Sequence, residues 1–186
     1  MKKYIYTTQK DFLIEKNQPN SDIDEKVKEI ILNAMDMDDF IEALRLKYGE
    51  KVPLYHATTI ENSEIIDKEG LKLTHGRNFK NFSDFENLYF QIGHSDYISS
   101  NRPVLYRWDA PLDFILNFGY ADMDNVDTSD DKLIELGIDI DDLNSDILDI
   151  ITAFVYNDMK LDGLELLFMD VDDSGTFPTI NPIKIR

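Results

Sequence analysis

The side chains that could perform catalysis are few, and their spacing excludes several kinds of chemistry. Cysteine is absent, so thiol catalysis, thiolate metal sites and a disulfide framework are excluded. His56, His75 and His94 are each 19 residues apart, without the close spacing of a zinc site. The sequence contains no Walker loop, GxGxxG, GxSxG or HExxH motif. We therefore expect no resident metal.

One acidic segment resembles part of a calcium site. Asp170 to Gly175 carries oxygen-bearing side chains at the first, third and fifth positions and glycine at the sixth. Asn181 stands where the bidentate glutamate of a calcium loop belongs, and Pro178 interrupts the segment. We therefore interpret it as an acidic hairpin turn.

His56 occupies a position suited to ligand binding. Val52 and Leu54 predict a short strand that ends near it, and Thr59 can cap the helix that follows. A strand end fixes a polar side chain while ligands still reach it. A lone histidine at such a position is nevertheless more often a structural hydrogen-bonding residue than a catalyst.

Glu165 is the most unusual acid of the chain. It lies among leucine and phenylalanine residues in a predicted strand over 164–169. Burying a carboxylate there is unfavourable unless it has a partner or a purpose. The alternative is an edge-strand charge that prevents aggregation.

The elements around these residues predict an α+β fold. In the helix after His56, Ile65 and Ile66 should form the buried stripe, and Gly70 should end it. The other predicted helices begin at Ser21 and Met37 and cover 130–136 and 142–156. The predicted strands cover 3–7, 11–15, 71–73, 87–92, 103–109, 164–169 and 179–185.

Charge and composition bound the function. The formal net charge is -18, from 37 acidic and 19 basic side chains. Such a field repels phosphate backbones and attracts basic surfaces, so we expect a basic protein partner and no direct nucleic-acid binding. No stretch approaches the ~18 apolar residues of a membrane span, and the N-terminus has no apolar signal segment. We expect a cytoplasmic protein, or an effector delivered to a host cytoplasm, without membrane association.

Four segments form an ordered pattern. His56 is followed by a small residue and threonine, a helix then ends in Gly-Leu, and Tyr89 follows His56 by 33 residues. Glu165 opens a late strand. The segments are Leu54-Tyr-His-Ala-Thr-Thr, Glu69-Gly-Leu-Lys, Asn87-Leu-Tyr-Phe and Gly163-Leu-Glu-Leu-Leu-Phe-Met-Asp. The pattern resembles the core of the ADP-ribosyltransferases of the diphtheria-toxin and poly(ADP-ribose) polymerase type.

The resemblance implies a fold and a reaction. The fold would be a split β-sheet core over residues 51–186, preceded by a mainly helical extension over residues 1–50. The substrate would be NAD, and the product an ADP-ribosylated protein. His56 would hydrogen-bond the nicotinamide-side ribose, Tyr89 would stack on nicotinamide, and Glu165 would bind the ribose 2′-OH. Glu165 would also stabilise the oxocarbenium-like transition state.

The resemblance implies further cofactor-binding residues. Ala57 replaces the usual glycine, whose backbone faces the nicotinamide carboxamide, and Thr58 follows it. Lys72 stands where some relatives place a basic residue near the pyrophosphate. Tyr97 would be the second aromatic residue beside nicotinamide.

Two alternatives stay open. A second alignment places residues 176–182 over the late strand, so that Thr176 would replace Glu165, which argues against transferase activity. Gly163 also excludes a Glu-x-Glu motif, so the resemblance gives no support for arginine as the acceptor. The competing function is a non-catalytic acidic inhibitor or interaction protein that imitates nucleic acid on a basic surface.

Overall fold

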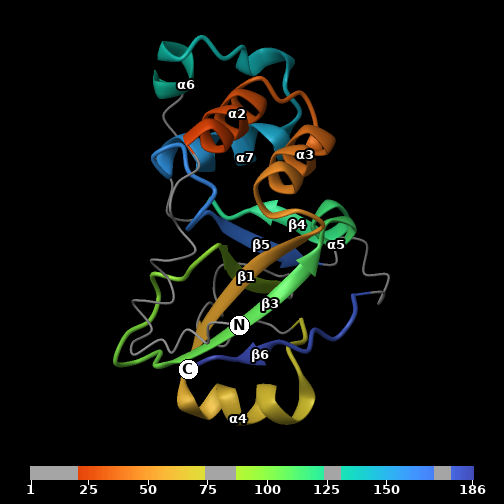
Figure 1. Cartoon of the computed structure of the whole chain (residues 1–186), viewed down its shortest axis with the longest axis vertical. Coiled ribbons are helices and arrows are strands. Elements are labelled where there is room, and N and C mark those ends of the chain that lie inside the picture. The colour runs from red at the N-terminus through yellow and green to blue at the C-terminus, as the bar shows by residue number, and fades with distance from the viewer. Residues whose placement is uncertain (1–20, 74–86, 124–130, 170–176) are drawn as a thin grey trace, which may run out of the picture.

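The computed structural model describes residues 21–73, 87–123, 131–169 and 177–186. The helices are α2 (Ser21–Leu32), α3 (Met37–Tyr48), α4 (Ile60–Glu69), α5 (Leu112–Phe118), α6 (Asp131–Glu135) and α7 (Ser145–Tyr156), with a 3₁₀ turn, η1 (Ile140–Asp142). The strands are β1 (Lys51–Thr58), β2 (Asn87–Ile92), β3 (Val104–Pro111), β4 (Gly119–Ala121), β5 (Glu165–Met169) and β6 (Ile183–Lys184). Together they form the predicted α+β fold, with α2, α3 and α7 on one side of an antiparallel sheet and α4 at its opposite end (Figure 1).

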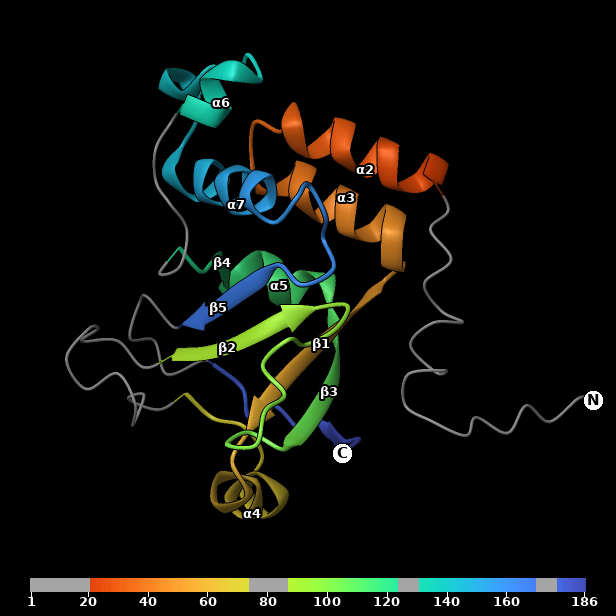
Figure 2. The same cartoon turned by 90° about the vertical axis from the view of Figure 1, so that its left-hand side faces the viewer.

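The sheet has six strands, and the pairing of β1 with β2 at its centre is short. Its strand order is β4-β5-β2-β1-β3-β6. β1 pairs with β3 along its whole length, from Lys51 to Thr58. β1 and β2 are paired at only two positions, Leu54↔Ile92 and Tyr55↔Gln91. In Figure 2, β2 and β5 run side by side and cross β1 at a steep angle. We call the place where residues 56–58 continue beyond this register the split.

Local signals explain where the helices begin and end. Asp36 accepts hydrogen bonds from the first backbone amides of α3, and Gly49 ends that helix at φ +82°. Thr59 caps α4 through its hydroxyl, which accepts from the Asn62 amide at 3.1 Å. Asn144 caps α7 in the same way. No helix in the described part of the chain is long and apolar enough to cross a bilayer.

One hydrophobic core joins the helices to the sheet. Helices α2 and α3 contribute to the same core as the strands, so the first described helices pack on the rest of the chain. Burial of such side chains contributes about 1.5–3 kcal/mol each. Large side chains that are almost fully buried include Ile31, Phe40, Leu44, Leu54, Phe90, Ile92, Phe154 and Phe168.

Several sequence-based predictions need correction. Ile65, predicted to be buried, is 39% exposed, whereas Ser63 is 2% exposed. Ser63 can occupy the inner face because its hydroxyl donates to the Ile60 carbonyl at 2.7 Å. The strand predicted after Gly70 is a single bridge, Leu71↔Ile180. The strands predicted over 3–7 and 11–15 and the calcium-like turn lie outside the described residues.

Two elements of the structure were not predicted from the sequence. Helix α5 and strand β4 follow Pro111 directly, and no element was predicted there. Both are short, so the apolar periodicity that identifies longer elements is missing. Phe114 of α5 nevertheless packs on Trp108 and Phe168, with ring centroids 4.7 and 5.4 Å away. Tertiary packing, rather than local pattern, fixes this segment.

Candidate functional site

His56 marks the start of the split. Its Nδ1 lies 2.9 Å from the backbone carbonyl of Tyr89. A carbonyl only accepts hydrogen bonds, so Nδ1 carries the proton. Burial lowers the pKa of the imidazole, Arg102 lowers it further, and the bond to Tyr89 partly opposes the shift. His56 is therefore neutral at pH 7, with Nε2 as an acceptor.

The backbone of Ala57 points into the split. Ala57 pairs with Leu105 of β3. Leu105 directs its N–H and C=O away from β1, to residues 185 and 186. Ala57 and Leu105 therefore form a pair without mutual hydrogen bonds, in which the N–H and C=O of each residue point away from the other strand. The N–H and C=O of Ala57 thus point toward β2. The β1–β2 register has ended there, and the Tyr89 carbonyl accepts from His56. An N–H donor and a C=O acceptor thus stand side by side at the split.

Glu165 opens β5, and two polar side chains, those of Tyr97 and Gln91, approach its carboxylate. The hydroxyl of Tyr97 donates a hydrogen bond to its Oε1. Gln91 of β2 pairs with Glu165 in the register, and its amide lies 3.5 Å from the same oxygen. Gln91 is itself fixed, because its Oε1 accepts from the Asp96 amide at 2.8 Å. The Glu165 carboxylate is therefore held in one orientation.

A second acid, directly after β4, faces Glu165. The register Ala121↔Leu166 brings the next residue, Asp122, opposite Glu165, and the Asp122 amide donates to the Glu165 carbonyl at 3.2 Å. Asp122 is 8% exposed. Burial raises the pKa of Glu165, and Asp122 raises it further, whereas the Tyr97 hydrogen bond lowers it. Facing carboxylates are unfavourable in a sheet unless they serve a function or share a proton.

The structure separates the predicted catalytic residues by sheet face. Tyr55, Gln91 and Glu165 are register partners and share one face. Tyr89 lies on that face too, since side chains alternate along a strand. Alternation places His56 on the other face, where its ring lies 5.7 Å from Phe90. The imidazole therefore does not stand against the Glu165 carboxylate, and their strands are about 10 Å apart.

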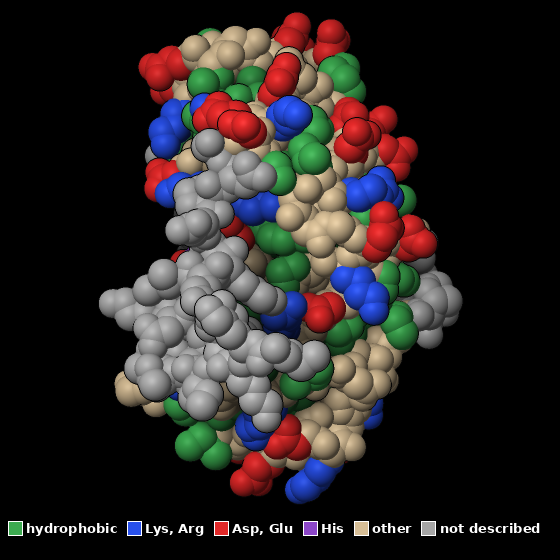
Figure 3. Space-filling model, viewed as in Figure 1, with side chains coloured by type: hydrophobic (Ala, Val, Ile, Leu, Met, Phe, Trp, Pro, Cys, Tyr) green, Lys and Arg blue, Asp and Glu red, His purple; other side chains and the backbone are tan. Residues whose placement is uncertain are grey.

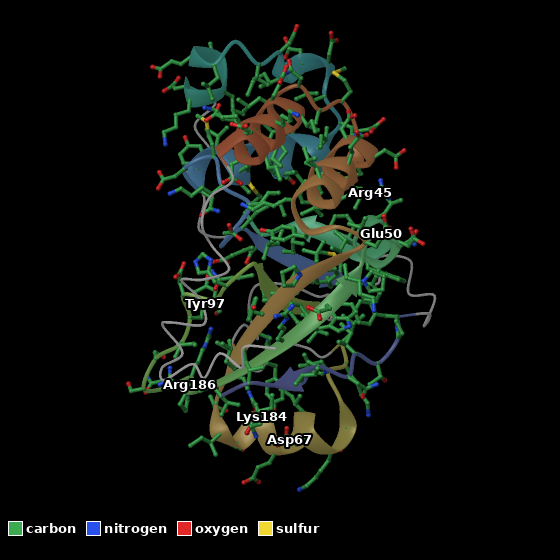
Figure 4. The ribbon with its side chains drawn as sticks, in the orientation of Figure 1. Arg45, Glu50, Asp67, Tyr97, Lys184 and Arg186 are labelled. Atoms are coloured by element: carbon green, nitrogen blue, oxygen red, sulfur yellow. The ribbon has the colours of Figure 1, made fainter. Side chains whose placement is uncertain are left out.

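The predicted cofactor-binding residues have different surroundings. Tyr97 contacts Glu165 directly and lies on the side of the molecule away from Arg45 (Figure 4). Lys72 is exposed and pairs with Glu69 at 3.1 Å. Thr58 is buried at the end of β1. Sequence reasoning missed Gln91, although it lies two residues after Tyr89, the spacing that keeps strand residues on one face.

Gly163 explains why no Glu-x-Glu motif precedes β5. Its φ is +88°, and an added Cβ would lie 3.1 Å from Cε1 of His94. A side chain there would be strained and would crowd the imidazole. His94 itself lies 3.2 Å from Asp96, and His75 is outside the described residues. Within residues 21–73, 87–123, 131–169 and 177–186, no cluster of three or more histidine or acidic residues could hold a metal ion.

Comparison with protein-family models, with curated proteins and with solved structures finds no match to this chain.

Proposed function

We propose that the protein is an NAD-dependent mono-ADP-ribosyltransferase that modifies a protein target. The observation that carries this proposal is the hydrogen bond between Tyr97 and Glu165. Glu165 lies on β5, two strands from the Ala57 backbone groups on β1. The order of strands supports it as well. β1, β2 and β5 are neighbours in the sheet and carry His56, Tyr89 and Glu165 in turn. The late strand beside β2 is β5, which favours Glu165 over Thr176 as the third residue.

The geometry suggests how NAD would bind. A carboxamide needs one donor and one acceptor, which the Ala57 backbone offers at the split. The rings of Tyr89 and Tyr97 would stack on nicotinamide. Glu165 would then accept from the ribose 2′-OH. His56, on the other face of the sheet, would shape the split through its hydrogen bond to the Tyr89 carbonyl.

The chemistry follows from charge. The bond between ribose C1′ and the nicotinamide nitrogen breaks, and nicotinamide leaves neutral with the bonding electrons. Positive charge grows on the ribose, and the fixed Glu165 carboxylate stabilises it. A nucleophile of the target forms the new bond to C1′ and gives up its proton. Ordering by Tyr97 and Gln91 reduces the reorganisation that this stabilisation requires.

The partner would be basic. The net charge of -18 attracts cationic surfaces. Figure 3 shows one face of the molecule, where Asp and Glu side chains are spread over the upper helices with Lys and Arg side chains between them. The same charge favours the second candidate function, a non-catalytic inhibitor that binds a basic surface. Salt-dependent binding to a basic protein that survives loss of both His56 and Glu165 would support this candidate.

NAD binding and nicotinamide release by the wild type, His56→Ala and Glu165→Ala test the proposal. Glu50→Gln is the matched control, because Glu50 is exposed and pairs with Arg45 (Figure 4). We expect the wild type and the control to bind and cleave NAD, and Glu165→Ala to bind NAD but cleave it far more slowly. A wild type that neither binds nor consumes NAD would refute the enzymatic function.

A further inference from the structure

Arg102 is a cationic residue beside the Tyr97–Glu165 pair. It lies between β2 and β3, at the end of a tight turn in which its amide donates to the Ser99 carbonyl and hydroxyl, each at 3.2 Å. Its guanidinium carbon lies 5.7 Å from the centre of the Tyr97 ring. The turn therefore fixes the arginine beside the residue that orders Glu165.

Arg102 has no acidic partner among the described residues. Arg45 and Arg107 pair with Glu50 and Asp109, and Lys47 pairs with two aspartates. No described carboxylate lies within 4.0 Å of the Arg102 guanidinium. A partly buried guanidinium without a carboxylate partner in the described part of the chain has donors for another anion.

The charge of Arg102 acts on two residues of the candidate site. It lowers the pKa of His56 and opposes the rise in the pKa of Tyr97. Of these two residues, Tyr97 is the one whose ring lies beside the guanidinium.

We propose that Arg102 is the anion-binding residue of this site and that its ligand is the pyrophosphate of a dinucleotide. The inference rests on the proposed function. A planar guanidinium can donate two parallel hydrogen bonds to phosphate oxygens. A chain of net charge -18 repels an anionic ligand, so a local cation must offset that field. Arg102 would draw the phosphates away from Glu165 and Asp122, which leaves the ribose nearest the carboxylate.

Lys72, the residue that the resemblance suggests for this role, is less available. It is exposed and pairs with Glu69 on the same helix end. Lys72→Ala should therefore change dinucleotide affinity much less than Arg102→Ala.

Calorimetric titration with ADP-ribose, inorganic pyrophosphate and nicotinamide separates the contributions. The variants are Arg102→Ala and Arg102→Lys, and the matched control is Arg45→Ala, which removes an ion-paired arginine far from Tyr97 (Figure 4). We expect Arg102→Ala to weaken ADP-ribose and pyrophosphate binding about 10- to 100-fold and Arg102→Lys to weaken it less. Nicotinamide affinity should stay unchanged.

Three results would overturn the inference. They are unchanged ADP-ribose affinity in Arg102→Ala, an equal loss for nicotinamide and ADP-ribose, and a wild type that binds neither ADP-ribose nor pyrophosphate. The proposed function fails separately. A wild type that binds ADP-ribose through Arg102 but releases no nicotinamide from NAD would uphold the anion site and refute the transferase.

Discussion

The hydroxyl of Tyr97 donates a hydrogen bond to Oε1 of Glu165, joining residues 68 positions apart in the chain. The two residues influence each other's protonation in opposite directions. The bond lowers the pKa of Glu165, although burial and Asp122 raise it overall. Burial and the nearby Glu165 raise the pKa of Tyr97, so the phenol keeps its proton and remains a donor. The pair therefore holds an oriented carboxylate in a half-buried place.

Asp122→Asn tests the facing acids. The proposed catalysis needs ionised Glu165, so activity should rise with pH as this carboxyl loses its proton. The pKa of Glu165 lies above its ordinary value, and the negative charge of Asp122 is one cause. Removing that charge should lower the pKa and move the acidic limb of kcat/KM to lower pH. A limb that stays in place or moves to higher pH would contradict the coupling.

Tyr97→Phe should shift the same limb in the opposite direction. The substitution removes a hydrogen bond that lowers the pKa of Glu165 and keeps the aromatic ring. The limb should therefore move to higher pH, and kcat should fall about 10-fold because the carboxylate loses its orientation. The pH profile of nicotinamide release measures both effects. If the acidic limb moves in the same direction in Tyr97→Phe and Asp122→Asn, the Tyr97 hydrogen bond and the Asp122 charge do not act on the pKa of Glu165 as described.

The sequence predicted most of the elements and part of the site. Caps and apolar periodicity identified α3, α4 and α7 because those signals are local. Strand patterns also placed Tyr89 and Glu165 on elements that prove to be neighbours in the sheet. Helix α5 and strand β4 stayed hidden because they are short and fixed by packing.

The remaining site residues depend on register. Asp122 faces Glu165 only through the pairing of β4 with β5, and no local pattern shows which strands pair. The face on which His56 lies follows from β1–β2 pairing, which the sequence could not reveal. A shift of one residue would move every side chain to the opposite face.

The backbone groups of Ala57 can be tested with proline. Ala57→Pro removes an N–H that faces the split, so it should weaken nicotinamide binding and change stability little. Thr58→Pro is the matched control. The Thr58 N–H points to β3 by the same alternation, so its loss breaks the β1–β3 ladder.

Calorimetry and thermal melts distinguish the two proline variants. Thr58→Pro should lower Tm more than Ala57→Pro, while Ala57→Pro should lose nicotinamide affinity. If Ala57→Pro lowers Tm as much as Thr58→Pro does, the Ala57 amide belongs to the ladder and cannot hold a carboxamide.

A partly buried ionic network should stabilise the loop before β5. The Tyr48 hydroxyl donates to Asp162 at 2.7 Å, and Lys47 pairs with the other oxygen of Asp162 at 2.8 Å. Tyr48→Phe removes a hydrogen bond to a charged group, which contributes about 1.5–3 kcal/mol. For a chain of this size, Tm should fall by about 3–12 °C. A Tm of Tyr48→Phe equal to that of the wild type would show that the Asp162 bond contributes nothing.

The most direct measurement of the transferase function is nicotinamide release from NAD by the wild type and Glu165→Gln. Glutamine keeps the shape of the side chain and removes its charge, so folding and NAD binding should persist. We predict that the wild type releases nicotinamide and that Glu165→Gln does so about 100-fold more slowly or worse. A wild type without NAD cleavage, or a Glu165→Gln variant as active as the wild type, would contradict the proposed catalytic role of Glu165.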